Sequence, residues 1–452
     1  MASLARLRFE TALLSTGWAS DVAIEVDGGV IRSVEAGGDG ERVGGIAIPG
    51  APNLHSHSFQ RAMAGLAETR GPAEDSFWTW RQAMYRFVRA LTPGDVEAIA
   101  ALAFMEMLEG GFTSVAEFHY LHHAADGAPY TVLAEMALRI ARAAEEVGIA
   151  LTLLPVFYAA GGFGGAPVGD AQRRFFNSPE RFLRLCEEAR GALAGRADVV
   201  VGIALHSLRA VTPEGLDEVV GATPAGPIHI HVAEQVAEVE GCLAWSGQRP
   251  VAWLLAHQPV DARWCLIHAT HTNAAELRGM GRSGLVVGLC PITEANLGDG
   301  IFDALKYRGA FGIGSDSNVA ITAAGELQLL EYGQRLKHRA RNVLAGAEGS
   351  STGRALYDGM LAGGARALQR DALGVAVGQR ADIVVLRRDH PGLAAASGDG
   401  VLDAYIFSAG RAAIDSVFVS GRRVVSEGKH PRREEIIARY SEVVRRIGCL
   451  DH

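Results

Sequence analysis

Two histidines stand one residue apart in the stretch PGAPNLHSH, residues 49–57, directly after a Pro-Gly turn and an apolar run. Imidazole nitrogens are common metal ligands, and side chains at positions i and i+2 of a strand point to the same side. His55 and His57 can therefore bind one ion together. A His-x-His pair alone is more often two surface or capping histidines, so this interpretation depends on what else lies near the pair.

Further polar residues close later apolar runs of the chain. His206 lies at the end of VVVGIALHS. Three further polar residues, His231, His268 and Asp316, lie in later apolar runs. Each of them alone has a plain explanation, such as a histidine packed in the core or an aspartate that caps a helix. Their joint occurrence at the ends of apolar runs favours a metal site instead, provided that the run ends meet in space.

Eight apolar runs, most of them separated by helical stretches, predict the elements that would bring these residues together. The runs are IPGAPNLHSH, FTSVAEFHY, ALTLLPVFY, VVVGIALHS, PIHIHVAE, RWCLIHAT, GLVVGLCP and AFGIGSDS. Strands that alternate with helices over residues 49–370 predict an α/β fold, a (β/α)₈ TIM barrel. The carboxyl ends of barrel strands form the active-site face, so the polar residues would surround the mouth of the barrel.

The two ends of the chain have a different sequence pattern. Residues 1–48 and 371–430 contain short alternating runs with glycine-rich punctuation, as in DVAIEVDGGVIRSVEAGG and ADIVVLRRDHP. We predict that these two segments pair into one small composite β-sandwich domain. Residues 431–452 are predicted to form a C-terminal helix that packs on the surface.

Three imidazoles and one carboxylate suit Zn²⁺, with iron(II) or manganese as alternatives. We expect His55, His57, His231 and Asp316 to be the ligands and one position to remain for water, whose pKa a bound divalent ion lowers to about 7. Two-metal sites on similar barrels need a carboxylated lysine near the fourth strand. No lysine precedes Lys306, so a single ion is expected.

Two residues beside the expected ligands can handle protons. Glu234 follows His231 by three residues, and a carboxylate there can take a proton from water and deliver it to a leaving nitrogen. His268 can stabilise an addition intermediate by hydrogen bonding, and Asp316 can accept a water proton through its second oxygen. The plainer alternatives are an exposed glutamate that opens a helix and a histidine of the core.

The composition excludes several classes of protein. The chain has 452 residues, 48% hydrophobic and 21% charged, which suits a soluble globular protein with a sizeable core. A net charge of -8 without a long basic run argues against a nucleic-acid partner. Five scattered cysteines without CxxC spacing, no signal-peptide pattern and no apolar run of about 18 residues predict a cytoplasmic protein that does not enter a membrane.

Taken together, the motifs resemble the amidohydrolase superfamily, in its mononuclear deaminase branch. PGAPNLHSH, HVAEQ, IHAT and GIGSDSN are similar to its motifs at strands 1, 5, 6 and 8, and GQRADIVVL to the segment that completes its small sandwich. Within the superfamily, the chain is similar to the N-formimino-L-glutamate deiminase family. The segments that carry this resemblance are LHSHSFQRAMAGLAE, DSFWTWRQAMYRF, SVAEFHYLHH and LHSLRAV.

The resemblance implies metal-dependent hydrolytic deamination of N-formimino-L-glutamate, a small molecule, to N-formyl-L-glutamate and ammonia in histidine degradation. It is also compatible with a homodimer. The residues that hold the substrate in that family match Gln60, Arg81, Tyr120, His206 and Arg209. Arginine forks suit a dicarboxylate, and the loop that carries Arg81 could close over the substrate. Trp78 and Trp80 of the same loop are expected to be packing residues.

Two alternatives remain open at this point. The same machinery could serve an aminohydrolase of guanine, an s-triazine or another aromatic amine, although paired arginines argue against a neutral ring. A metal-binding or carrier protein on an inactive barrel is the other alternative, and the presence of both Glu234 and Asp316 argues against it. The sequence leaves open the native metal and the roles of four further residues, namely Glu117, His122, His123 and His271.

Overall fold

The computed structural model describes residues 5–70, 76–370 and 374–448. Its central sheet is parallel, in the strand order β14-β13-β12-β11-β10-β8-β7-β6, with β9 beside β8. The strands are β6 (Ala51–Ser56), β7 (Phe112–His119), β8 (Ala150–Phe157), β9 (Val199–Val201), β10 (Ile203–Leu205), β11 (Ile228–Val232), β12 (Trp264–His268), β13 (Val286–Leu289) and β14 (Ala310–Ile313). Each of the eight predicted runs contains strand, and the predicted TIM barrel is confirmed.

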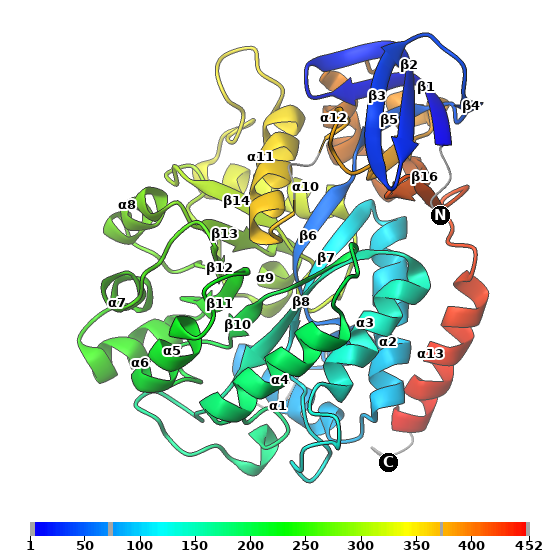
Figure 1. Ribbon diagram of the computed structural model, residues 1–452. Coiled ribbons are helices and arrows are strands. Elements are labelled where there is room, and N and C mark those ends of the chain that lie inside the picture. The colour runs from blue at the N-terminus through cyan, green and yellow to red at the C-terminus, as the bar shows by residue number, and fades with distance from the viewer. Residues whose placement is uncertain (1–4, 71–75, 371–373, 449–452) are drawn as a thin grey trace.

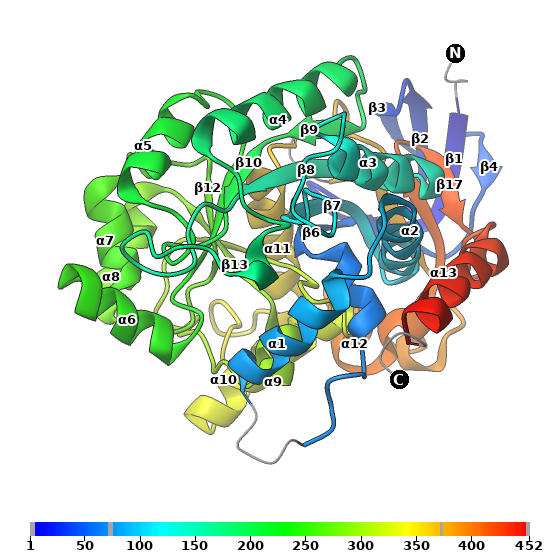
Figure 2. The ribbon, with the colours of Figure 1, turned by 90° about the horizontal axis from the view of Figure 1, so that it is seen from below.

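The strands are buried and largely apolar because both of their faces are covered, one by the barrel interior and the other by helices. Figure 2 shows the helices as an outer ring around the strands. They are α1 (Phe77–Val88), α2 (Pro93–Glu109), α3 (Glu135–Val147), α4 (Pro179–Ala192), α5 (Pro213–Gly221), α6 (Val236–Ser246), α7 (Pro250–His257), α8 (Ala274–Ser283), α9 (Pro291–Leu297), α10 (Ala323–His338) and α11 (Thr352–Ala367). Several begin at a capping residue followed by proline, as at Thr92 and Thr212, which fixes where each helix starts.

The barrel closes between β6 and β14 through a short seam. The Asp316 N–H donates to the carbonyl of His55 (2.9 Å), and the His57 N–H donates to the carbonyl of Asp316 (2.8 Å). Beneath them, the Asn53 side chain donates to Ser315 Oγ at 2.6 Å. The residues that close the barrel are thus the same ones for which the sequence predicted metal binding.

Both ends of the chain build a second sheet, in the order β17-β16-β15-β5-β1-β2-β3 with β4 beside β1 (Figure 1). Its strands are β1 (Ala5–Leu14), β2 (Gly17–Asp27), β3 (Val30–Ala36), β4 (Glu41–Arg42), β5 (Ile46–Pro49), β15 (Ile383–Leu386), β16 (Ile414–Val419) and β17 (Arg422–Val425). The two ends meet where β5 pairs antiparallel with β15. This confirms the small β domain that the sequence predicted from both termini. The predicted boundaries at 371 and 452 fall outside the described residues.

The C-terminal helix α13 (Arg433–Gly448) runs alongside α2 in Figure 1. It is tied to α2 by Glu109, a fully buried carboxylate that accepts hydrogen bonds from Arg433 and from the His430 N–H. The short helix α12 (Gly400–Ala404) precedes β16. Within the described ranges, no helix combines the length and apolar character needed to cross a bilayer.

The four cysteines of the described residues are buried and unpaired, at positions 186, 242, 265 and 290. Burial raises the pKa of the Cys186 thiol to about 12 and raises that of Cys265 as well, which keeps these side chains protonated and inert. Cys449 lies outside the described residues.

Candidate active site

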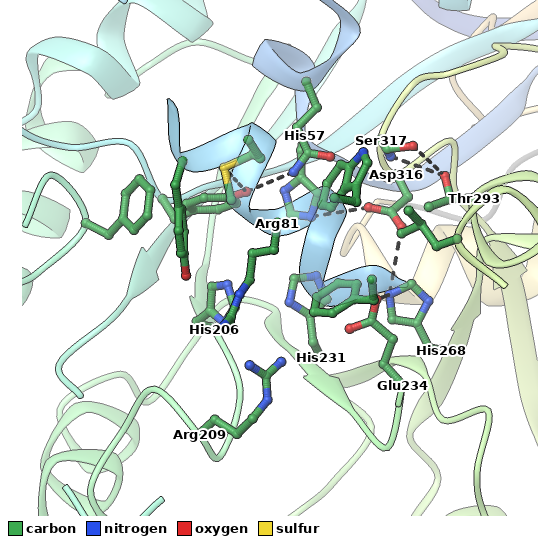
Figure 3. A pocket seen from close by; sticks show the side chains of 18 of the residues that line it. His57, Arg81, His206, Arg209, His231, Glu234, His268, Thr293, Asp316 and Ser317 are labelled. Atoms are coloured by element: carbon green, nitrogen blue, oxygen red, sulfur yellow. Dashed lines mark hydrogen bonds and ion pairs between the residues drawn. The ribbon is translucent and has the colours of Figure 1, made fainter. Parts of the chain in front are cut away.

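A small cavity opens at the carboxyl ends of the barrel strands (Figure 3). Every residue that the sequence singled out for catalysis, substrate binding or metal binding lines this cavity, except His55. His55 lies directly beneath it and is fully buried. The structure therefore brings together side chains that are up to about 260 residues apart along the chain.

Three imidazoles and one carboxylate cluster at the floor of the cavity and just beneath it. His55 Nε2 lies 3.0 Å from His231 Nε2 and 3.5 Å from Asp316 Oδ1. His57 Nε2 lies 3.3 Å from the same carboxylate oxygen, while the His57 Nδ1–H donates to the Phe118 carbonyl at 2.9 Å. The Nδ1 bond fixes the tautomer of His57, so its Nε2 presents a lone pair to the cluster.

The electrostatics of this cluster favour the protonation states that ligands need. Burial lowers the pKa of His55 to about 3 and keeps the pKa values of His57 and His231 below their usual range, so the imidazoles are neutral. Burial opposes ionisation of Asp316, but hydrogen bonding and charge interactions with His55 and His57 hold its pKa below the usual range. Neutral imidazoles beside an ionised carboxylate are the ligand forms of these groups.

These residues fit a divalent metal ion. His55 and His231 turn two Nε2 atoms towards each other, an arrangement in which at most one of the pair can carry a proton and which a shared cation satisfies. His55, His57 and Asp316 form one group of ligand atoms within 4.8 Å of one another, and His55, His231 and His268 form another. The donor set of nitrogens and one carboxylate oxygen suits Zn²⁺ and other borderline metals.

His268 connects the cluster to two further carboxylates. Its Nε2 lies 3.7 Å from Glu234 Oε1 and 3.8 Å from Asp316 Oδ2, and its Nδ1 lies 3.3 Å from Glu294 Oε1. Glu294 belongs to α9, and it also accepts a hydrogen bond from the Cys290 N–H at 2.9 Å. The ring of His268 is therefore held from its far side, with Nε2 directed into the cavity.

The same contacts set the charges of this proton-handling group. Burial alone would lower the pKa of His268, but Glu234, Glu294 and Asp316 outweigh it and raise that pKa to about 10. Burial raises the pKa of Glu234, and the charge of His268 opposes the rise. A carboxyl group that both holds and releases a proton near neutral pH suits general acid–base catalysis.

Two arginines face this cluster from the other side of the cavity. Arg81 comes from α1 and Arg209 from the loop after β10, and Figure 3 shows both guanidinium groups on the side away from Asp316. Among the described residues, neither forms a salt bridge, and the buried Nε of each lacks a hydrogen-bond partner. Unpaired guanidinium donors aimed into a cavity suit an anionic ligand.

The remaining predicted substrate contacts also line the cavity. Gln60 Nε2 donates to the Tyr120 hydroxyl at 2.8 Å, and Gln60 Oε1 has no partner among the described residues. His206 packs edge-on against Tyr120 and Tyr158, with ring centroids 5.5 Å and 4.7 Å apart. The roles given to these residues by the sequence remain predictions, but their placement is compatible with them.

Sequence reasoning missed several lining residues, among them Tyr158, Thr293 and Ser317. Tyr158 had a usable signal, because it is the last residue of the predicted run ALTLLPVFY and directly follows β8. Thr293 had none, because it lies on α9 and no strand-end rule applies there.

The polar residues of β7 lie elsewhere. Phe118 and Tyr120 contact the cavity residues, so the alternation of a strand turns Glu117 and His119 to the opposite side. Glu117 accepts hydrogen bonds from the Ser58 N–H and hydroxyl at 2.7 and 2.6 Å, which stabilises the turn after His57.

The three histidines whose roles the sequence left undecided do not line the cavity within the described part of the chain. His122 and His123 are buried and bonded to backbone carbonyls, through Nε2 in each case. His271 is partly exposed beyond β12, near Gly300.

Two family models match the chain. A model of the amidohydrolase family matches residues 46–424, and a model described as the N-terminal domain of formimidoylglutamate deiminase HutF matches residues 9–41. A formimidoylglutamate deiminase of Pseudomonas aeruginosa is 50% identical to this chain over 443 residues, which cover 96% of the chain and 98% of that protein.

Solved structures resemble the fold over nearly its whole length. The crystal structure of an amidohydrolase from Brucella melitensis aligns with a TM-score of 0.94 at 54% identity, covering 98% of this chain and 99% of that one. An adenosine deaminase from Xanthomonas campestris with bound zinc aligns with a TM-score of 0.82 at 21% identity, covering 98% of each chain. At that identity, the second likeness shows the fold alone.

Proposed function

This chain belongs to the amidohydrolase family, and from that membership we propose that it hydrolyses N-formimino-L-glutamate to N-formyl-L-glutamate and ammonia in histidine degradation. The enzyme is a hydrolase that acts on a carbon–nitrogen bond. The similarity to a formimidoylglutamate deiminase extends over 96% of the chain, and the matching N-terminal model carries the same name.

The observation that carries the choice of substrate is the pair of arginines. Arg81 and Arg209 share one small cavity with the His–Asp cluster and have no carboxylate partner among the described residues. N-formimino-L-glutamate carries its amidine on Cα, with one carboxylate on the same carbon and the second carboxylate at the end of a two-methylene side chain. A substrate of that shape can place its carboxylates on the guanidinium groups and its formimino carbon near Glu234 and His268.

We propose a single divalent ion, most simply Zn²⁺, held by His55, His57, His231 and Asp316. Their neutral imidazoles and ionised carboxylate support this assignment. When bound, such an ion supplies Lewis acidity that lowers the pKa of water towards neutrality.

The chain's own residues then move the protons of the reaction. Glu234 accepts a proton as water adds to the formimino carbon, and it delivers that proton to the nitrogen that leaves as ammonia. His268 donates a hydrogen bond from Nε2 to the tetrahedral addition intermediate and lowers its energy. Asp316 accepts the second water proton on the oxygen that faces His268 as the intermediate collapses, and this proton also passes to the leaving nitrogen, which thereby departs as ammonia. One water is consumed, and the C=N bond of the amidine becomes the C=O bond of the formyl group.

Other residues orient the substrate. The free amide oxygen of Gln60 can accept a hydrogen bond from a substrate N–H, and Tyr120 is held in place by the amide of Gln60. His206 lies between the arginines and the ion cluster, in ring contact with His231 at 5.2 Å. These contacts fix the distance between the two arginines and the reacting carbon, which is the usual source of proximity catalysis.

The direct test is release of ammonia by the zinc-loaded protein. We expect saturable turnover of N-formimino-L-glutamate and a kcat/KM for guanine lower by at least about 1,000-fold, because a neutral ring leaves both guanidinium groups without partners. Preferred turnover of guanine or of an s-triazine would instead favour the aromatic aminohydrolase. The homodimer and the cytoplasmic location expected from the sequence remain predictions.

A further inference from the structure

Trp78 lies behind both arginines of the cavity. The Cζ atom of Arg81 is 4.5 Å from the centroid of the Trp78 ring, and the Cζ atom of Arg209 is 5.4 Å from it. The two arginines come from different elements, since Arg81 lies on α1 and Arg209 lies in the loop after β10. One indole ring thus bridges two cationic side chains that are far apart in the sequence.

This arrangement solves an electrostatic difficulty. Two guanidinium groups that share one end of a small cavity repel each other, and among the described residues no carboxylate neutralises either of them. The negative face of an indole attracts a guanidinium more strongly than any other aromatic side chain does. Because Trp78 offers this face to both groups, it can hold them close together while their N–H donors stay free for a ligand.

Trp78 itself is fixed from outside the cavity. Its backbone N–H donates to the Ser76 side chain at 3.3 Å, in the capping box that starts α1, and its ring packs edge-on against Phe77. Among the described residues that line the cavity, Phe77, Trp80 and Arg81 represent this end of α1, and Trp78 is not one of them. It therefore acts on a ligand only through the arginines.

We propose that Trp78 is a positioning residue that sets the specificity for dicarboxylates by holding Arg81 and Arg209 as one clamp for two carboxylates. This inference rests on the proposed function and deepens it. It also differs from the expectation from sequence, in which Trp78 only packs.

The test compares Trp78→Leu and Trp78→Phe in the zinc-loaded enzyme. We expect Trp78→Leu to raise the KM for N-formimino-L-glutamate at least about 10-fold while kcat and zinc content stay within about 2-fold, because the clamp and not the reacting centre is disturbed. Trp78→Phe keeps an aromatic face, so we expect its KM to lie between that of the wild type and that of Trp78→Leu. For N-formimino-4-aminobutyrate, which lacks one carboxylate, the loss in kcat/KM caused by Trp78→Leu is several-fold smaller.

Trp245→Leu is the matched control. Trp245 is also partly exposed, but it stacks on Phe163 outside the cavity lining, so its loss leaves both KM values unchanged. A Trp78→Leu enzyme with the wild-type KM overturns the inference. Equal losses for the two substrates, or a Trp78→Phe variant as impaired as Trp78→Leu, overturn it too, since they indicate a purely structural role.

Calorimetric binding of glutarate separates this inference from the proposed function. Glutarate presents two carboxylates and cannot react, so its dissociation constant reports the clamp even if N-formimino-L-glutamate is not turned over. We expect Trp78→Leu to weaken glutarate binding about 10-fold. Absence of glutarate binding by the wild-type protein, or equal binding by both proteins, rejects the clamp whatever the enzyme's substrate is.

Discussion

At the scale of single residues, the site holds several side chains on a left-handed backbone. Asp316 has φ of 46°, His268 has φ of 68° and Ala269 has φ of 48°, values that cost residues other than glycine about 1–2 kcal/mol each. Such strain persists only where neighbouring bonds fix the conformation. Here the Asp316 N–H is bonded to His55 of β6 and its C=O to His57 directly after that strand, so the carboxylate enters the cluster in one defined orientation.

Glu234→Gln should keep the ion and lose the reaction. Glutamine has nearly the same shape but cannot accept a proton, and general acid–base catalysis contributes about 100- to 10,000-fold in rate. We expect a kcat lower by about that factor, with zinc content equal to wild type as measured by elemental analysis. If kcat stayed within about 3-fold of wild type, another group would have to transfer the proton.

Arg209→Met should damage substrate recognition more than chemistry. Loss of a charged hydrogen bond to a carboxylate costs about 1.5–3 kcal/mol, which corresponds to a KM higher by about 10- to 150-fold. Steady-state kinetics with N-formimino-L-glutamate measure this, and Arg278→Met on the exposed face of α8 is the control. Wild-type kinetics of Arg209→Met would contradict the assignment of a carboxylate to this guanidinium.

The sequence predicted the residues that end strands better than those that do not. His57, His231 and Asp316 could be found because each directly follows or ends an apolar run, and barrel strands bring such positions to one face. Glu294, which holds the ring of His268, could not be found in this way. It lies on α9, and its contact depends on how that helix packs rather than on any periodicity in the chain.

At the scale of elements, the seam between β6 and β14 depends on one buried amide. Asn318 Nδ2 donates to Ser56 Oγ at 3.1 Å and to the Asp316 carbonyl at 2.9 Å, and Asn318 Oδ1 accepts from Ser315 Oγ at 2.6 Å. These bonds link the two strands that close the barrel. They also support the backbone of a predicted metal ligand.

Asn318→Ala should therefore weaken both the barrel and its hold on zinc. Partners left buried without hydrogen bonds cost about 1–3 kcal/mol each, so we expect the free energy of unfolding to fall by about 2–4 kcal/mol in urea titrations. Asn318 has φ of 59°, and Asn318→Gly separates the lost bonds from the backbone strain of alanine. A change in both variants below about 0.5 kcal/mol would mean that the amide contributes little.

The loop after β7 is held by two neutral histidines. The His122 Nε2–H donates to the Val156 carbonyl at 2.9 Å, and the His123 Nε2–H donates to the Phe176 carbonyl at 3.0 Å. Burial lowers the pKa of both imidazoles from the ordinary value of 6.5, and the charge of Arg181 lowers them further. The folded loop therefore excludes two protons that an unfolded chain would bind.

It follows that acid should destabilise the protein through this loop. Below pH 6.5 the unfolded chain protonates His122 and His123 while the folded chain does not, so the free energy of unfolding falls as the pH falls. His119 and Arg174 also face the pair and strengthen the exclusion. Replacing both histidines by glutamine should flatten the dependence of the urea midpoint on pH between about 7.5 and about 4.5. An equally steep dependence in that variant would assign the effect to other groups.

At the scale of the whole molecule, the sequence predicted the fold class. It did not predict the side-chain contacts that hold the parts of the molecule together. Alternating apolar runs and helical stretches predicted the barrel, and glycine-rich strand patterns at both ends predicted the small β domain. The attachment of α13 depends on Glu109, which lies at the end of a helix. Nothing in the sequence around it indicates that its partners lie about 300 residues away.

Glu109→Gln should loosen this attachment. The buried carboxylate pairs with the partly exposed guanidinium groups of Arg411 and Arg433, so loss of its charge leaves both without their partner. We expect about 1–3 kcal/mol lower stability, reduced from the value for fully buried pairs because both arginines reach solvent. Faster hydrogen exchange in α13 than in the barrel strands would accompany it. Glu434→Gln, an exposed change on the same helix, is the control, and equal behaviour of the two variants would refute the tie.

The pairing of early strands with late ones has a consequence for how this polypeptide is made. β6 completes the barrel only after β14 has left the ribosome, and β5 meets its neighbour β15 later still. Strands β1, β2, β3 and β5 can pair with one another as they emerge, but β5 lacks its other neighbour until more than four fifths of the chain has been made. All strands of the barrel are therefore made before the small β domain receives its last three strands, β15, β16 and β17, so the barrel can fold while its companion is still incomplete.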